Sequence, residues 1–182
     1  MSYTLDKVVV GFLQTNCYLL ADAKTKNCAI IDPGADYELI KARLDRKNLK
    51  PLFIINTHGH PDHTGANKQF NLPLYMHKDD AIYLSQKPDK LLKDAQEIQL
   101  DSLLLKVIHT PGHTPGGICI LCEDILLSGD TLFESGIGRT DLPYGDEAQI
   151  LNSIKRKLFT LDGNIKVYPG HGPETTIKRE RS

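Results

Sequence analysis

One short stretch, residues 57–63, reads Thr-His-Gly-His-Pro-Asp-His and carries three histidines and a carboxylate. It follows residues 52–55, an apolar run typical of a buried strand. Imidazole nitrogens and carboxylate oxygens together suit Zn, Fe or Mn, whereas a solvated turn rarely contains so many histidines. The stretch is therefore predicted to bind metal at the end of a strand.

Further potential ligands follow other apolar runs beside glycine or proline: His113, Asp130 and His171. Within the cluster, residues two apart in an extended loop face the same side, so His58 and His60 can share one ion. Asp62 and His63 follow a proline, where the chain must turn, and can face a neighbouring ion. These loops are expected to meet at one edge of the fold.

A single catalytic zinc takes three protein ligands and keeps one position open. The candidates here number seven: His58, His60, Asp62, His63, His113, Asp130 and His171. They suit two ions about 3.5–4 Å apart that share a carboxylate, and Asp130, outside the cluster, is the natural bridge. Two divalent ions are predicted, with zinc as the first expectation. Because no cysteine is needed as a ligand, the mixed oxygen and nitrogen site can also accept iron or manganese.

Composition limits the classes of partner. The 182 residues are 40% hydrophobic and 25% charged, with a net charge of −1, so no global field attracts nucleic acid or an anionic membrane. No run approaches the roughly 20 apolar residues of a spanning helix.

The first residues lack the pattern of a signal peptide, so a cytoplasmic location is expected. The basic ending, residues 177–182, is expected to be a solvated terminus.

Cys119 and Cys122 have the spacing of a redox pair or zinc clip. They lie, however, in residues 117–122, which are typical of a buried strand. Positions three apart on a strand point to opposite faces, so the two sulfurs are expected to diverge. Both cysteines are interpreted as small core residues in a reducing compartment.

Hydrophobic patterning predicts strands at residues 7–13, 17–20, 28–31, 52–55, 72–76, 103–108, 117–122, 125–128 and 165–168. Helices are predicted at residues 35–48, 64–70, 79–84 and 146–158, and residues 91–99 are ambiguous. Strand-rich blocks at 7–31 and 97–128 are each followed by a helix, a strand and a histidine-bearing loop. One α/β (α+β) sandwich domain over residues 1–182 is expected, with two sheets face to face and helices outside.

Four motifs occur in one order: Thr-His-x-His-x-Asp-His at 57–63, Gly-His-Thr-Pro-Gly at 112–116, Ser-Gly-Asp-Thr at 128–131 and Tyr-Pro-Gly-His-Gly at 168–172. Together they resemble the metallo-β-lactamase superfamily over nearly the whole chain. The chain looks most similar to glyoxalase II-like hydrolases of the short bacterial type, which lack a C-terminal helical domain.

The resemblance implies an αββα sandwich of two mixed sheets with two ions at one edge. The first ion is expected to take His58, His60 and His113. The second is expected to take Asp62, His63 and His171, with Asp130 as the bridge. True β-lactamases of the superfamily commonly carry Cys at the position of Asp130, which counts against that activity.

The expected reaction is hydrolysis of a small-molecule acyl thioester, with S-lactoylglutathione as the first candidate substrate. Two ions bring the pKa of a bridging water towards neutrality and stabilise the oxyanion. Asp62 is expected to orient the attacking hydroxide or carry a proton. A mononuclear-iron persulfide dioxygenase is the alternative, with His58, His113 and Asp130 as ligands, because residues 138–141 resemble both classes. A non-enzymatic metal-binding module is a third reading.

Other residues have less definite roles. Asp32, in a turn after a strand, is expected to hold a histidine ring from behind. Arg139 and Tyr144 are candidates for substrate contact, although an Arg139–Asp141 pair is favoured. His77 is expected to be structural, and His109 is left open. Without a helical domain, thiol contacts would come from residues 133–145 or a neighbouring subunit, or thiol selectivity would be weak. The oligomeric state stays open.

Overall fold

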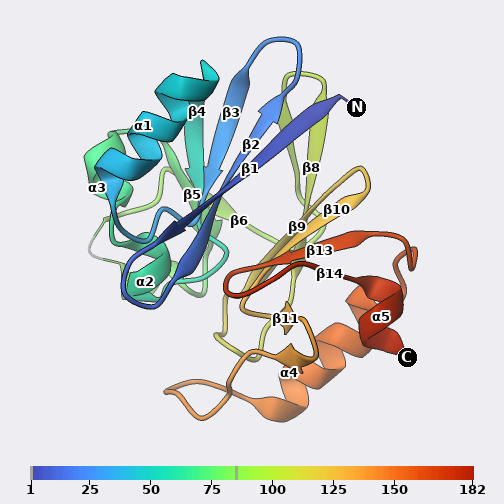
Figure 1. The fold of residues 1–182 in the computed structure, drawn as a ribbon. Coiled ribbons are helices and arrows are strands. Elements are labelled where there is room, and N and C mark those ends of the chain that lie inside the picture. The colour runs from blue at the N-terminus through green and yellow to red at the C-terminus, as the bar shows by residue number, and fades with distance from the viewer. Residues whose placement is uncertain (1, 85) are drawn as a thin grey trace.

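The computed structural model describes residues 2–84 and 86–182 and shows two mixed six-stranded sheets (Figure 1). The first sheet has the order β1 (Tyr3–Val10), β2 (Thr15–Asp22), β3 (Asn27–Ile31), β4 (Lys50–Ile55), β5 (Leu74–His77) and β6 (Lys90–Leu92). Its first three strands are antiparallel, and β3 to β6 run parallel.

The second sheet has the order β14 (Thr175–Thr176), β13 (Lys166–Pro169), β10 (Ile125–Gly129), β9 (Ile118–Cys122), β8 (Leu103–His109) and β7 (Glu97–Leu100). Only the β10–β13 pair is parallel among these strands. A short antiparallel pair, β11 (Leu132–Phe133) and β12 (Gly136–Ile137), follows β10.

Helices cover the outer faces of the two sheets (Figure 1). They are α1 (Tyr37–Lys47), α2 (Pro61–Thr64), α3 (Asn67–Phe70), the 3₁₀ turn η1 (Ala81–Tyr83), α4 (Glu147–Ser153), the π-helical η2 (Ile154–Leu158) and α5 (Ile177–Arg181). In α1, Ile40 and Leu44 are one turn apart and face Ile54 of the first sheet. In α4, Ile150 packs in the same way against Leu126 of the second sheet.

The central apolar layer lies between the sheets. Leu20 and Ile31 from the first sheet pack there with Leu105 and Ile120 from the second. The fold is therefore the predicted αββα sandwich. Cys122 belongs to this layer, whereas Cys119 belongs to the layer under α4, so the two sulfurs point to opposite faces as predicted.

Several local predictions were imprecise or wrong. The helix predicted at 64–70 is two short helices, and the segment 79–84 contains only the turn η1. The ambiguous segment 91–99 contains parts of β6 and β7, which belong to different sheets, so the chain crosses between them there. The prediction of a solvated ending holds for the exposed Lys178, Arg179 and Arg181 but not for Ile177, which is fully buried. The segment is also ordered as α5, which Thr176 Oγ1 caps by accepting the amide N–H of Arg179.

Strand polarity brings the ligand-bearing loops together. The parallel strands β3 and β4 end at Ile31 and Ile55, directly before Asp32 and residues 56–63. The parallel strands β10 and β13 end before Asp130 and His171 in the same way. In the described part of the chain, no helix has both the length and the hydropathy that crossing a membrane would require.

Candidate metal centre

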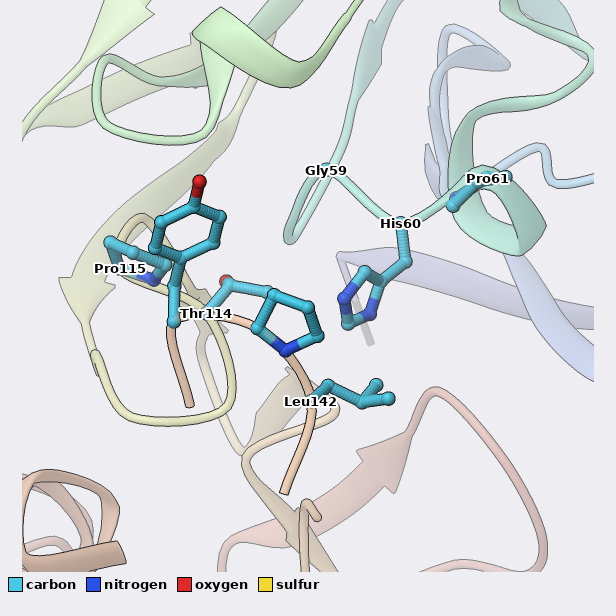
Figure 2. Close-up of a pocket in the computed structure, with 8 residues that line it drawn as sticks. Gly59, His60, Pro61, Thr114, Pro115 and Leu142 are labelled. Atoms are coloured by element: carbon cyan, nitrogen blue, oxygen red, sulfur yellow. The ribbon is translucent and has the colours of Figure 1, made fainter. Parts of the chain in front are cut away.

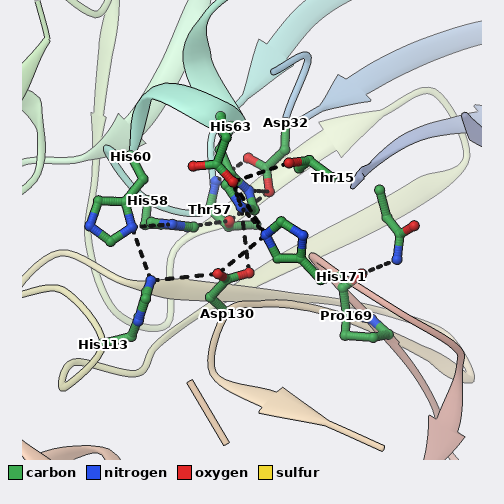
Figure 3. A network of polar contacts seen from close by, with 12 residues as sticks. Thr15, Asp32, Thr57, His58, His60, His63, His113, Asp130, Pro169 and His171 are labelled. Atoms are coloured by element: carbon green, nitrogen blue, oxygen red, sulfur yellow. Dashed lines mark hydrogen bonds and ion pairs between the residues drawn. The ribbon is translucent and has the colours of Figure 1, made fainter. Parts of the chain in front are cut away.

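All seven predicted ligands converge at one edge of the sandwich (Figure 3). The first triad is His58, His60 and His113. Nδ1 of His60 lies 3.0 Å from Nε2 of His58 and 3.0 Å from Nε2 of His113. Zinc–nitrogen bonds of 2.0–2.1 Å place tetrahedral ligands about 3.3 Å apart. The first triad therefore needs only small adjustments to surround one ion.

The second triad is Asp62, His63 and His171. Nε2 of His171 lies 3.3 Å from both Nε2 of His63 and Oδ2 of Asp62. Nε2 of His63 lies 3.5 Å from the same Asp62 oxygen. These spacings also match a tetrahedral ion, so the second triad could hold one.

Asp130 lies between the two triads. Its Oδ1 is 3.5 Å from Nε2 of His63, and its Oδ2 is 3.5 Å from Nε2 of His113. Oδ1 is buried and accepts no hydrogen bond from any described residue, although Nε2 of His63 lies near it. A buried carboxylate oxygen without a hydrogen-bond partner carries a desolvation cost, and a position between two cations would offset it. The donor set thus fits a dinuclear centre.

Three ligand rings are held by the nitrogen that faces away from the centre. Nδ1 of His63 donates to Oδ2 of Asp32 at 3.0 Å. Nδ1 of His113 donates to the Arg139 carbonyl at 2.8 Å, and Nδ1 of His171 donates to the Leu13 carbonyl at 3.0 Å. Each contact leaves Nε2 as the metal-facing atom and fixes the ring orientation.

Asp32 is the buried residue behind the cluster that the sequence predicted. Its carboxylate also accepts the amide N–H of Thr57 at 2.7 Å and the Thr57 hydroxyl at 2.6 Å. Burial lowers the pKa of His63, but the negative charges of Asp32 and Asp130 outweigh it and raise that pKa to about 9. Without metal, His63 therefore holds an extra proton.

Asp80 was missed by sequence reasoning. Its carboxylate is fully buried and accepts the N–H of Gly59 at 2.8 Å, the Thr114 hydroxyl at 2.7 Å and the N–H of Gly116 at 2.5 Å. It thereby joins the loop of His58 and His60 to the loop of His113. A carboxylate soon after a buried parallel strand was the available signal, but residues 79–84 were interpreted as helical.

The start of β2 supports the second triad and was also missed. Thr15 Oγ1 donates to Oδ2 of Asp62 at 3.1 Å. The amide N–H of Asn16 donates to the Gly170 carbonyl at 2.7 Å, next to His171. The β1–β2 hairpin therefore positions two of the second-triad residues, Asp62 and His171.

His77 and His109 form a separate pair with stacked rings, 3.9 Å apart and inclined by 12°. Asp79 lies near both, and the three residues are within metal-binding distance of one another. Because the rings are stacked, however, their nitrogen lone pairs lie in parallel planes and do not point at a common ion. Nε2 of His109 also donates to the Pro115 carbonyl at 2.9 Å. The pair links β5 to β8, which agrees with the structural role expected for His77.

Arg139 and Tyr144 belong to the loop that borders the cluster. The Arg139 guanidinium donates twice to Asp141, at 2.8 and 2.7 Å, as the favoured interpretation held. Arg139 also lines a cavity of about 440 Å³ over the ligands, together with Leu142. Tyr144 lines an adjacent cavity (Figure 2).

Known proteins resemble this chain in sequence. A model of the metallo-beta-lactamase superfamily matches residues 10–171. The probable metallo-hydrolase YqgX of Bacillus subtilis is 35% identical, and the match covers 96% of this chain and 93% of the relative. The hydroxyacylglutathione hydrolase GloC of Haemophilus influenzae is 34% identical, over 97% of this chain and 94% of the relative.

Solved structures resemble it as well. The BLEG-1 B3 metallo-beta-lactamase has a TM-score of 0.92 at 35% identity, covering 97% of this chain and 96% of that one. ETHE1 from Myxococcus xanthus has a TM-score of 0.88 at 28% identity, covering 98% and 81%. TTHA1623 in a di-iron-bound form has a TM-score of 0.85 at 32% identity, covering 97% and 96%.

Proposed function

Because this chain belongs to the metallo-β-lactamase superfamily, we propose that it is a dinuclear metal-dependent hydrolase of acyl thioesters. S-lactoylglutathione or a related 2-hydroxyacyl thioester is the proposed substrate, cleaved to a carboxylate and a free thiol. One observation carries the proposal: the unpartnered Oδ1 of Asp130 lies between two complete triads of nitrogen and oxygen ligands. The resemblance to GloC, which is named a hydroxyacylglutathione hydrolase, supports the substrate class.

In this proposal the first triad holds one ion, the second triad holds the other, and Asp130 lies between them. When bound, two divalent ions supply hydroxide near neutral pH and polarise a carbonyl oxygen. Zinc is the first expectation, and iron or manganese also suits the mixed nitrogen and oxygen ligands. The di-iron form of TTHA1623 shows that a protein of this fold can hold two irons.

Asp62 has the environment of a carboxylate that stays ionised and orients water, rather than of a base that readily accepts a proton. Burial raises its pKa, but its hydrogen bond with His171 and the nearby charge of His63 outweigh this and hold that pKa well below the ordinary value. Thr15 fixes the carboxylate from the other side. Asp62 therefore stays ionised near pH 7. The leaving thiolate of a thioester needs little help from a general acid, so an ionised Asp62 is compatible with the reaction.

The persulfide dioxygenase reading is the second candidate. The similarity to ETHE1 from Myxococcus xanthus is compatible with it, and its single iron would need only His58, His113 and Asp130. The second triad is complete and supported by Asp32 and Thr15, which favours the hydrolase. A single-iron enzyme would not use the second triad as metal ligands.

The test measures bound metal first and then turnover of S-lactoylglutathione, with a glutathione persulfide and a chromogenic β-lactam as competing substrates. We expect thiol release from the thioester, and loss of both metal and turnover in Asp130→Ala. Asp141→Ala, which alters only an exposed pair with Arg139, is the matched control for metal content. Full thioester turnover in Asp130→Ala would overturn the dinuclear scheme, and oxygen uptake with the persulfide would favour the dioxygenase.

A further inference from the structure

A cavity beside the candidate metal centre has an apolar lining and a volume of about 370 Å³ (Figure 2). Its walls come from two ligand loops and from the loop before α4: Gly59, His60, Pro61, Thr114, Pro115, Leu142, Pro143 and Tyr144. None of these eight side chains is a carboxylate, an ammonium or a guanidinium. The cavity therefore suits an uncharged, apolar group.

This cavity adjoins the cavity over the ligands, where the reaction is proposed to occur. His60 and Leu142 line both this cavity and the cavity over the ligands. A molecule whose reacting carbonyl lies over the two triads can thus extend past His60 into the apolar space. The apolar cavity would then hold one half of such a molecule, and the other half would lie in the cavity over the ligands.

Charge decides which end of a thioester enters. The carrier half of a biological thioester, such as glutathione, bears carboxylates and amides, which lose hydration in an apolar cavity. Apart from histidine, the only cationic side chain lining either cavity is Arg139, and it borders the space over the ligands. The half that can be wholly apolar is the acyl group.

The wall formed by the loop before α4 is held in shape by its own backbone. Tyr144 has a φ of 69°, in the left-handed region that a residue with a side chain seldom adopts. The next residue, Gly145, donates its N–H to the Leu142 carbonyl at 2.9 Å and closes the turn. This hydrogen-bonded turn fixes the backbone of the wall.

We propose that this cavity is the acyl subsite, and that it takes an aliphatic or aryl acyl group larger and less polar than lactoyl. The inference rests on the proposed thioester hydrolysis and moves the preferred acyl group from lactoyl to a larger, apolar one. Each methylene buried in the cavity is expected to raise kcat/KM about threefold to fourfold until the space is filled.

The test uses glutathione thioesters with acetyl, lactoyl, butanoyl, hexanoyl and phenylacetyl groups on protein of measured metal content. We expect kcat/KM to rise with apolar acyl size, mainly through KM. Tyr144→Ser should flatten this rise, because it removes the ring from one wall of the cavity. Leu39→Ser removes a half-exposed apolar side chain on α1 that lines neither cavity, and should keep the rise.

Inhibition by the product acids gives a second readout that does not depend on turnover of a varied ester. Hexanoate and phenylacetate should inhibit more strongly than lactate, and Tyr144→Ser should remove the difference. Lactoylglutathione turnover with no preference for apolar acyl groups would overturn the subsite while leaving the proposed function intact. No turnover of any thioester by metal-loaded protein would overturn the proposed function, and the subsite inference with it.

Discussion

Oδ2 of Asp32 lies 3.0 Å from Nδ1 of His63, and both side chains are almost completely buried. The contact orients the imidazole and makes Nε2 a better ligand. We predict that Asp32→Asn lowers affinity for one of two ions by about 10- to 100-fold. Asparagine also tolerates the left-handed backbone at this position (φ 54°). Metal titration followed by calorimetry measures the change, and two ions bound with unaltered affinity would contradict it.

Metal binding at the second triad is predicted to release a proton. Asp32 and Asp130, acting against burial, raise the pKa of His63 to about 9 in the metal-free protein. Below pH 9 an ion must displace this proton, so apparent affinity should rise about tenfold per pH unit up to pH 9. Calorimetry in buffers of different ionisation enthalpy counts the released protons. Asp32→Asn should shift the release to lower pH, and equal release in both proteins would count against the assignment.

Asp80→Asn is predicted to weaken the first triad selectively. The asparagine amide would face N–H donors with a donor of its own, so one contact to Gly59 or Gly116 is lost. Removing a hydrogen bond to a buried charge costs on the order of 2 kcal/mol. We expect weaker binding of one ion. The proton that His63 releases when the other ion binds should be unchanged. Loss of both ions together would instead indicate general unfolding, which far-UV circular dichroism would detect.

Gly170→Ala is predicted to disrupt the centre by contact. A Cβ atom there would lie 2.2 Å from Oδ1 of Asp130 and 2.7 Å from Cε1 of His63. Both side chains must move away from the new methyl group, which lowers the stability of the fold by about 1–3 kcal/mol. Metal content should fall as a result. Gly136→Ala is the matched control, because no heavy atom lies within 4 Å of its Cβ. Equal metal content in the two variants would show that the close approach is unimportant.

His77 is predicted to make the fold sensitive to mild acid. Burial, with a smaller effect of His109, lowers the pKa of His77 from its ordinary value of 6.5 to about 4. Because the unfolded chain binds the proton more readily, stability should fall as pH drops from 6.5 to 4, by on the order of 2 kcal/mol. His77→Phe keeps a ring against His109 but cannot titrate. Urea unfolding of both metal-free proteins should show a shallower decline for the variant, and parallel curves would contradict this.

The sequence was most informative where a role is carried by a short contiguous motif. His58, His60, Asp62 and His63 are close in sequence, so their type and spacing predicted a cluster that the structure brings together. The sandwich was predicted because strand-rich blocks with period-two patterning must bury two faces. Asp32 was found because it ends a strand as the ligand loops do.

Residues that act across long separations escaped prediction. Asp80 contacts Gly59 and Gly116, which are 21 and 36 residues away, so no local pattern announces its role. Thr15 reaches Asp62 over 47 residues in the same way. The burial of Ile177 was missed because most of the residues that follow it in the sequence are charged. The apolar surface that covers Ile177 comes from the second sheet and its helices, which are distant in the sequence.

Each triad takes its ligands from both halves of the sandwich. His58 and His60 follow β4 in the first sheet, whereas His113 follows β8 in the second, and His63 and His171 are divided in the same way. An ion in either triad is thus a cross-link between sheets, in a chain whose four cysteines are all free. Its binding free energy is shared with folding. Metal binding should therefore slow amide hydrogen exchange in strands of both sheets, even far from the ions. The two sheets would then unfold together and not separately.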